Sequence, residues 1–148
     1  MTNRIVLPRI MQTGAGASKD IPQILATLGC SRPLIITDKM MVELGYVRRI
    51  EEVLETSGIV SDVFADTVPE PTSASITAGV DRVRAGNFDS IIALGGGSPI
   101  DSAKAIGILG KFGGEMRDYK FPRDVCEEGL PLIAIPTTAG TGSEATRF

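Results

Sequence analysis

The segment GGGSPIDSAK, residues 95–104, contains the residue types that point most clearly to chemistry in this sequence. Three glycines follow the apolar run 91–94, and Ser98 comes next. Glycine lets a bulky anion approach the backbone with no Cβ in its way. A helix that begins here would direct its free N–H groups and the positive end of its dipole at that anion. The order predicts a phosphate site at Gly95, Gly96, Gly97 and Ser98, and a tight strand-to-helix turn is the alternative.

The residues after the glycines have the pattern of a sharp helix start. Ser98 is predicted to be the N-cap, with Pro99 as the first helical residue, where its missing N–H costs nothing. Asp101 follows Ser98 by three positions, which predicts a capping box. Lys104 follows Asp101 by three, so we expect the two side chains to pair on the helix surface. This spacing alone makes neither of them a catalyst.

Two further segments carry polar groups after apolar runs. Asp38 follows the run 33–37, where a carboxylate can accept hydrogen bonds from an adenosine ribose and repel a 2′-phosphate, which favours NAD over NADP. Its alternative role, the cap of a following helix, is compatible with this one. Residues 137–143, TTAGTGS, offer hydroxyls and glycines suited to phosphate, ribose or a carboxamide. A turn rich in serine and threonine is the competing interpretation.

An earlier glycine pair imitates a dinucleotide fingerprint. Gly14 and Gly16 are followed by Asp38 about 20 residues later, as in G-x-G-x-x-G motifs. Lys19 stands where the third glycine belongs, so this segment predicts a pyrophosphate site less well than residues 95–97.

Composition excludes several classes of function. The chain has 148 residues, a net charge of −3 and no histidine, so it lacks the commonest metal ligand and general base. The charge argues against a nucleic-acid partner, and no apolar run approaches the roughly 20 residues of a membrane span. There is no signal-peptide pattern. Cys30 and Cys126, with no C-x-x-C motif, indicate buried thiols in a reducing cytoplasm.

The elements that must position these groups alternate between strands and helices. Strands are expected at 5–11, 33–37, 60–64, 89–94 and 130–135, and helices at 18–28 (capped by Ser18), 40–44, 47–56, 73–85 and 99–109. This pattern predicts an α/β fold, a Rossmann-like, doubly wound, mostly parallel sheet with helices on both faces. Residues 1–148 are expected to form one dinucleotide-binding domain. Ligands of such sheets bind beyond the carboxyl ends of the strands, so Asp38 and residues 69–72, 95–98 and 137–143 should meet in one crevice.

Four sequence motifs together resemble the iron-containing (group III) alcohol dehydrogenases: GGGSPIDSAKAI, IPTTAGTGSEAT, ITD and PEPT. They stand in the order and spacing of that family, over essentially the whole chain. The resemblance implies hydride transfer between a small alcohol or aldehyde and NAD, with NADP less favoured. It implies a divalent metal, iron or zinc, held by one aspartate and three histidines of the complete enzyme. The cofactor-binding residues that it implies here are Asp38, Gly95, Gly96, Gly97, Ser98, Asp101, Thr137, Thr138, Thr141 and Thr146.

The sequence also departs from the family. Its members continue into an all-helical domain that supplies the histidines, and this chain has none. We therefore expect a truncated cofactor half that lacks metal ligands and is inactive alone. An apolar face left exposed by the missing half predicts a homo-oligomer. The alternatives are a stand-alone nucleotide-binding module without catalysis, or a relative of dehydroquinate synthase or glycerol dehydrogenase.

Overall fold

A computed structural model describes residues 8–119 and 128–146 of the chain. Its four strands are all parallel and lie in the order β2-β1-β3-β4, where β1 is Pro33–Ile36, β2 Asp62–Phe64, β3 Ser90–Gly95 and β4 Leu132–Pro136. The α-helices are α1 (Ile21–Leu28), α2 (Lys39–Glu43), α3 (Tyr46–Thr56), α4 (Ser73–Gly86) and α5 (Gly97–Phe112). Two 3₁₀ turns, η1 (Ala17–Asp20) and η2 (Met116–Tyr119), complete the described elements.

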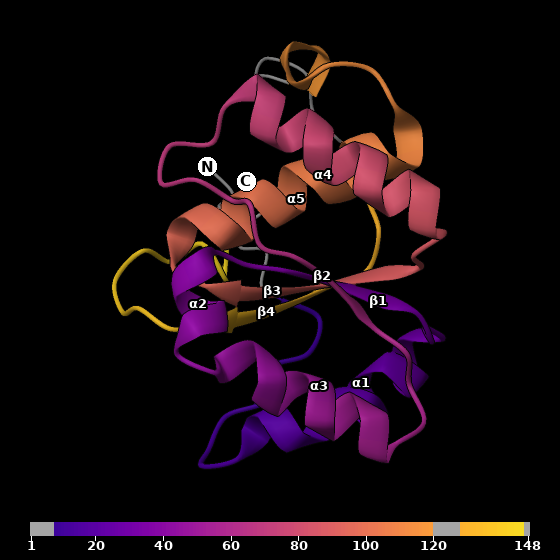
Figure 1. Ribbon diagram of the computed structural model, residues 1–148, viewed down its shortest axis with the longest axis vertical. Coiled ribbons are helices and arrows are strands. Elements are labelled where there is room, and N and C mark those ends of the chain that lie inside the picture. The colour runs from indigo at the N-terminus through magenta and orange to yellow at the C-terminus, as the bar shows by residue number, and fades with distance from the viewer. Residues whose placement is uncertain (1–7, 120–127, 147–148) are drawn as a thin grey trace, which may run out of the picture.

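Helices cover both faces of the sheet, which confirms the predicted α/β fold. In Figure 1 the sheet lies edge-on, with α4 and α5 above it and α1 and α3 below. Leu34 and Ile36 of β1 belong to the core beneath α4 and α5. Ile35, between them, belongs to the core on the α1 and α3 side. This alternation follows from the two-residue period of a strand, and both faces are apolar because a parallel sheet is buried on both.

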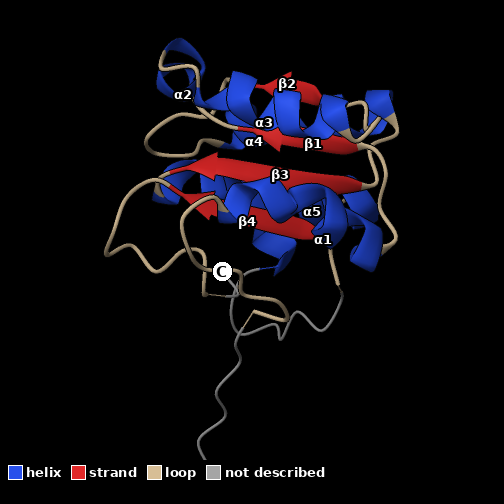
Figure 2. Cartoon of the chain, turned by 90° about the horizontal axis from the view of Figure 1, so that it is seen from below, coloured by secondary structure: helices blue, strands red, loops and turns tan. Residues whose placement is uncertain are grey.

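The order of the strands fixes where a ligand can bind. From β1 the chain crosses outward to β2, then returns to pair β3 with the opposite side of β1. The direction of winding therefore reverses between β1 and β3, and ligands of doubly wound sheets bind at the carboxyl ends beside such a reversal. Figure 2 shows β1 and β3 as neighbours, with loops and helix ends gathered where the β3 arrow points.

The amino-terminal part differs from the prediction. Residues 8–11 form no strand, and residues 5–7 lie outside the described residues. Ser18 does not cap a helix: it lies within η1, and α1 begins at Ile21. Pro22 explains the shift, because a helix capped at Ser18 would need an N–H on Pro22 to reach the Ser18 carbonyl.

Helix α4 is capped at both of its ends, whereas strand β2 is shorter than predicted. The Thr72 hydroxyl accepts from Ser75 N at 3.2 Å, and the Thr72 N–H donates to Ser75 Oγ at 3.1 Å, a complete capping box for α4. Asn87 ends α4 in the left-handed region, at φ 50°. Strand β2 starts later than predicted, since Val60 is 74% exposed and outside the sheet.

Among the described residues no helix combines the length and apolar character needed to cross a membrane.

Asp89 fastens the start of β3 to the loop before β1. Its carboxylate accepts hydrogen bonds from Ser31 N at 2.7 Å, Arg32 N at 3.0 Å and Ser90 Oγ at 2.8 Å. Burial works to raise the pKa of Asp89, but these hydrogen bonds outweigh burial and lower the pKa. Burial, followed by the charge of Asp89, raises the pKa of the Cys30 thiol nearby. Cys30 is buried as predicted, and Cys126 lies outside the described residues.

Candidate functional site

The four segments that follow strands converge at the carboxyl edge of the sheet, as predicted. Ser98 Oγ donates to the Pro69 carbonyl at 2.6 Å, which joins residues 69–72 to the start of α5. A Cβ added at Gly95 would lie 3.5 Å from Asp38 Oδ2, and one at Gly96 would lie 3.2 Å from Thr138 Oγ1. In Figure 1 this edge is on the left, where α2, the start of α5 and the yellow loop after β4 meet.

The three glycines allow protein segments to pack closely around the start of α5. Gly95 has φ +146°, and a Cβ there would lie 2.7 Å from Pro99 Cγ. A Cβ at Gly97 would lie 3.3 Å from both Ser143 Oγ and Thr141 Cγ2. The space beside each Cα is therefore filled by the chain itself. A ligand would reach the backbone N–H groups of this turn, so the tight-turn and phosphate interpretations are compatible.

Helix α5 begins earlier than predicted, which corrects the roles of Ser98 and Asp101. The N-cap is Gly96, with no side-chain cap, and Gly97 is the first helical residue. Ser98 is thus the second residue of the helix, so neither the Ser98 N-cap nor its capping box with Asp101 exists. The extended backbone of Gly96, at φ −79° and ψ −161°, carries the chain straight from β3 into the helix. In the described part of the chain no acceptor pairs with the N–H of Gly97 or Ser98.

Asp38 uses one carboxylate oxygen for the protein and leaves the other open. Its Oδ1 accepts from Met41 N at 3.0 Å and caps α2. Among the described residues none donates to Oδ2, the oxygen that faces Gly95. The cap is confirmed, and the second oxygen remains able to accept a hydrogen bond from a ligand hydroxyl.

Asp101 and Lys104 form the predicted pair, and they also hold the loop after β4. Lys104 Nζ lies 3.4 Å from Asp101 Oδ1 and 3.0 Å from Thr146 Oγ1, with the lysine side chain only 14% exposed. Ser143 Oγ donates to the other oxygen of Asp101 at 3.2 Å. Lys104 therefore links Asp101 on α5 to Thr146 in the loop after β4, and Ser143 of the same loop also bonds to Asp101. The pairing of Asp101 with Lys104 agrees with the prediction from their i, i+3 spacing, whereas the contacts of this pair with Ser143 and Thr146 could not be inferred from spacing.

The remaining threonines lie on the exposed loop after β4. The N–H of Thr137 donates to Gly95 O at 2.9 Å, which continues the pairing of β4 with β3 beyond the strand. Thr138 faces Gly96, and Thr141 faces Gly97. Thr137, Thr138 and Thr141 are all exposed. The loop thus presents hydroxyls beside the start of α5.

Two threonines that the sequence prediction did not include among the site residues, Thr37 and Thr67, connect the ends of the strands. Thr37, fully buried, donates its hydroxyl proton to Leu94 O at 2.8 Å and so links β1 to β3. Thr67 Oγ1 donates to Thr37 O at 2.7 Å and fastens the loop after β2 to the end of β1. These bonds fix the end of β1, which leads into Asp38, against the end of β3, which leads into the glycines.

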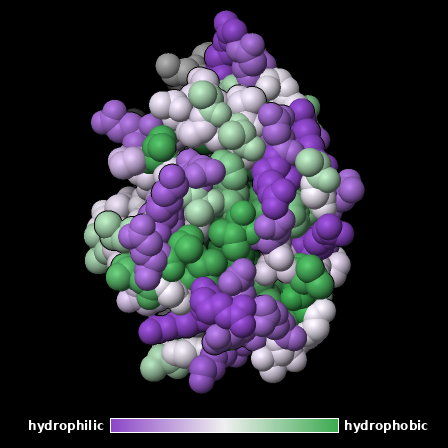
Figure 3. Space-filling view, viewed as in Figure 1, coloured by the Kyte–Doolittle hydropathy of each residue, from purple (hydrophilic) through white to green (hydrophobic). Residues whose placement is uncertain are grey.

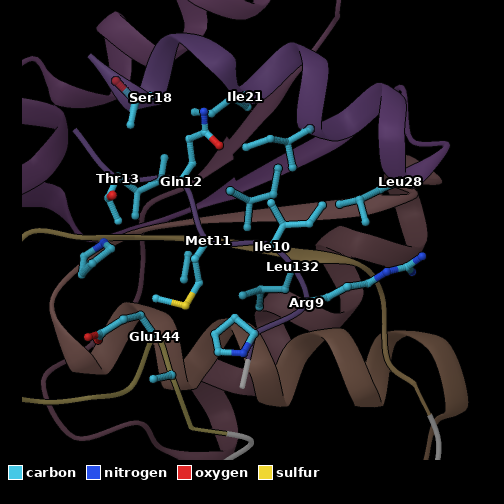
Figure 4. Close-up of a pocket in the computed structure, with 18 residues that line it drawn as sticks. Arg9, Ile10, Met11, Gln12, Thr13, Ser18, Ile21, Leu28, Leu132 and Glu144 are labelled. Carbon is cyan, nitrogen blue, oxygen red and sulfur yellow. The ribbon is translucent and has the colours of Figure 1, made fainter. Parts of the chain in front are cut away.

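An apolar pocket of about 490 Å³ lies elsewhere, beside the outer strand β4. Figure 4 shows Met11, Ile10 and Leu132 around it, with Glu144 at one side. Thr13 and Ser18, which flank the Gly14–Gly16 pair, line this pocket, whereas none of the predicted cofactor residues does. The early glycine pair follows no described strand, so it does not have the strand-turn-helix setting of a dinucleotide fingerprint.

Comparison with known proteins decides the family. The family model described as iron-containing alcohol dehydrogenase matches residues 8–148. The chain belongs to the iron-containing alcohol dehydrogenase family. It is 39% identical over 148 residues to long-chain-alcohol dehydrogenase 1 of Geobacillus thermodenitrificans (strain NG80-2), covering 98% of this chain and 38% of that protein. It is 37% identical over 142 residues to alcohol dehydrogenase 4 of Saccharomyces cerevisiae (strain YJM789), covering 96% and 37%.

Solved structures agree with that assignment. A 1,3-propanediol oxidoreductase superposes with a TM-score of 0.94 at 30% identity, over 99% of this chain and 38% of the other. Sulfoacetaldehyde reductase from Bifidobacterium kashiwanohense, solved in complex with NAD⁺, superposes with a TM-score of 0.87 at 31% identity, over 99% and 39%. The chain spans less than two fifths of the length of these relatives.

The part of the chain that the structure describes contains no set of ligands for the metal that the family name implies. The sequence has no histidine, and residues 8–119 and 128–146 contain no group of three Cys, Asp or Glu side chains able to hold a metal ion. The described residues do not fit a metal centre, and the chemistry proposed for them uses none.

Proposed function

We propose that residues 1–148 form a dinucleotide-binding domain that binds NAD at the edge between β1 and β3. The observation that carries this proposal is the meeting of four loops at the point where the winding of the sheet reverses. There Asp38 Oδ2, to which no described residue donates, faces Gly95, and the N–H groups of Gly97 and Ser98 just after it have no acceptor among the described residues. A dinucleotide requires both kinds of group, donors for its phosphates and an acceptor for its ribose.

Each part of the site has a separate role in this proposal. The N–H groups at the start of α5 would hold the pyrophosphate, aided by the positive end of the helix dipole. Asp38 Oδ2 would accept from the adenosine ribose, and its charge would repel the 2′-phosphate of NADP. Thr137, Thr138 and Thr141 would line the cofactor with hydroxyls. Asp101 and Thr146 would act one step away, since they hold the loop that carries those threonines.

We further propose that a longer protein with this segment is a metal-dependent alcohol dehydrogenase acting on a small alcohol or aldehyde. The family assignment supports the reaction, in which the nicotinamide exchanges hydride with the alcohol carbon. The described residues supply neither metal ligands nor a histidine base. The 148-residue chain is therefore expected to bind NAD and to form no NADH from alcohols, with or without added Fe²⁺ or Zn²⁺.

The test is calorimetric titration of the chain with NAD and with NADP. Asp38→Asn keeps a good helix cap but loses the charge, so NAD binding should weaken by tenfold or more, because hydrogen bonds to charged groups contribute about 1.5–3 kcal/mol. Preference for NAD over NADP should fall in the same variant. Gly96→Val should abolish binding, since its side chain would displace Thr138. The matched control is Thr56→Val, an exposed residue at the end of α3. A folded wild-type chain that binds neither nucleotide would refute the proposal.

Self-association and a cytoplasmic location also belong to the proposal. Figure 3 looks onto the β2 edge and shows apolar surface gathered in the middle of that face, bordered by polar side chains. At the other edge of the sheet the first four residues of β4 are only half-buried and Pro136 is exposed. Such surfaces favour a homo-oligomer. Light scattering coupled to size exclusion should give a mass above 15.6 kDa, and a monodisperse monomer would contradict this part.

A further inference from the structure

We propose that Ser98 is a positioning residue: its hydroxyl holds residues 68–71 beside the cofactor site and does not itself hydrogen-bond the phosphate. The consequence for cofactor binding rests on the proposed NAD site, whereas the geometry rests on the Ser98–Pro69 contact alone. Ser98 Oγ lies 2.6 Å from the Pro69 carbonyl, a short and direct hydrogen bond.

The Ser98 hydroxyl has a single proton. A serine has one O–H to donate, and it can accept further hydrogen bonds only from donors. A carbonyl oxygen accepts only, so the proton of this bond must come from Ser98. The oxygens of a pyrophosphate are also acceptors at neutral pH. Ser98 can therefore bond Pro69 or a phosphate oxygen, but not both at once.

The loop that Ser98 holds has few other attachments. Below it, Thr67 is fastened to Thr37, and above it, Thr72 opens α4. Between them stand Val68, Pro69, Glu70 and Pro71, in which the two prolines have no N–H to donate. In the described part of the chain, the bond from Ser98 is the one hydrogen bond or ion pair that reaches residues 68–71. The Lys39–Asp66 pair at the base of the loop is exposed and 3.8 Å long, so it contributes little.

The start of α5 does not need the Ser98 side chain to bind an anion. The N–H groups of Gly97 and Ser98 are without acceptors among the described residues, and they belong to the first turn of a sixteen-residue helix. Backbone donors can therefore serve the phosphate while the hydroxyl keeps the loop in place. Two functions of one residue are divided between its main chain and its side chain.

Nitrogen-15 relaxation on the labelled chain tests this assignment, with the Val68 and Glu70 amides as probes. In Ser98→Ala their order parameters should fall from about 0.85 to below about 0.6, while amides of β3 keep theirs. Ser98→Thr, which retains a hydroxyl, should restore the wild-type values. A loop of unchanged order in Ser98→Ala would overturn the proposal. Should that variant not fold, Ser98→Cys, with a weak donor of similar size, makes the same comparison.

A second measurement adds saturating NAD to the wild-type chain. The order parameters of Val68 and Glu70 in the wild-type chain should stay at about 0.85 with NAD bound. Loss of order at Val68 and Glu70 on adding NAD would show that the hydroxyl turns to the phosphate, and the proposal would fail. If the wild-type chain binds no NAD, the proposed function fails instead, and the relaxation data on the free protein still decide the role of Ser98.

Discussion

Replacement of Gly95 by alanine is the sharpest test of why this turn contains glycine. Gly95 has φ +146°, a backbone conformation that residues other than glycine rarely adopt, and such strain costs about 1–3 kcal/mol. The new Cβ would also lie 2.7 Å from Pro99 Cγ and 3.1 Å from Pro99 Cβ. Pro99 is buried and its ring is rigid, so relief requires movement of the start of α5, with an overpacking cost of about 1–3 kcal/mol.

The two costs together predict that Gly95→Ala lowers the free energy of unfolding by about 2–6 kcal/mol. With a urea m-value of about 2 kcal/mol/M, the unfolding midpoint should fall by about 1–3 M. Circular dichroism at 222 nm follows the transition. Gly140→Ala is the matched control, since Gly140 has φ +98° but no atom within 4 Å of the added Cβ. It should show the strain alone, about 1–2 kcal/mol.

A double-mutant cycle with Pro99→Ala isolates the steric part. Removal of the proline ring should recover about 1–3 kcal/mol of the loss in Gly95→Ala and leave Gly140→Ala unchanged. If Gly95→Ala costs no more than Gly140→Ala, or if the cycle shows no coupling, close packing against Pro99 is not the reason for this glycine.

Three further predictions concern the contacts around the site. Lys104→Met should loosen the attachment of residues 141–146 and speed their amide exchange by about fivefold, because the free energy of local opening falls by about 1 kcal/mol. An unchanged exchange pattern would contradict the network with Asp101. Thr37→Val, similar in shape, should cost about 1–2 kcal/mol in urea unfolding because Leu94 O loses its donor, whereas a neutral effect would mean that another group replaces it. Because the pKa of Asp89 is lowered in the folded protein, its contribution is complete at pH 7 and is lost as the pH falls below about 4. The stability gap between wild type and Asp89→Asn should therefore close in urea titrations from pH 7 to pH 3, and a gap independent of pH would rule out the carboxylate's role.

Local features of the fold could be predicted because local sequence causes them. The run Leu34–Ile36 is apolar at every position, which only a strand buried on both faces accommodates. Thr72 and Ser75 form their capping box through contacts three residues apart. Asp38 caps α2 in the same way. Motif order was sufficient to identify the family, and the alternation of elements was sufficient to predict convergence at one edge.

The tertiary structure decided which partner each polar side chain takes. Ser98 has a suitable sequence position for an N-cap, yet its proton goes to Pro69, 29 residues earlier. Asp101 was expected to complete a cap, but its second oxygen accepts from Ser143, 42 residues later. Neither partner can be read from spacing, because each bond depends on how β2 and β4 flank β1 and β3. The sequence by itself determined the central strands and helices and the edge of the sheet at which their loops converge. The strand order determined which hydroxyls and carboxylates at that edge remain open to a ligand, since only packing brings distant donors and acceptors within about 3 Å.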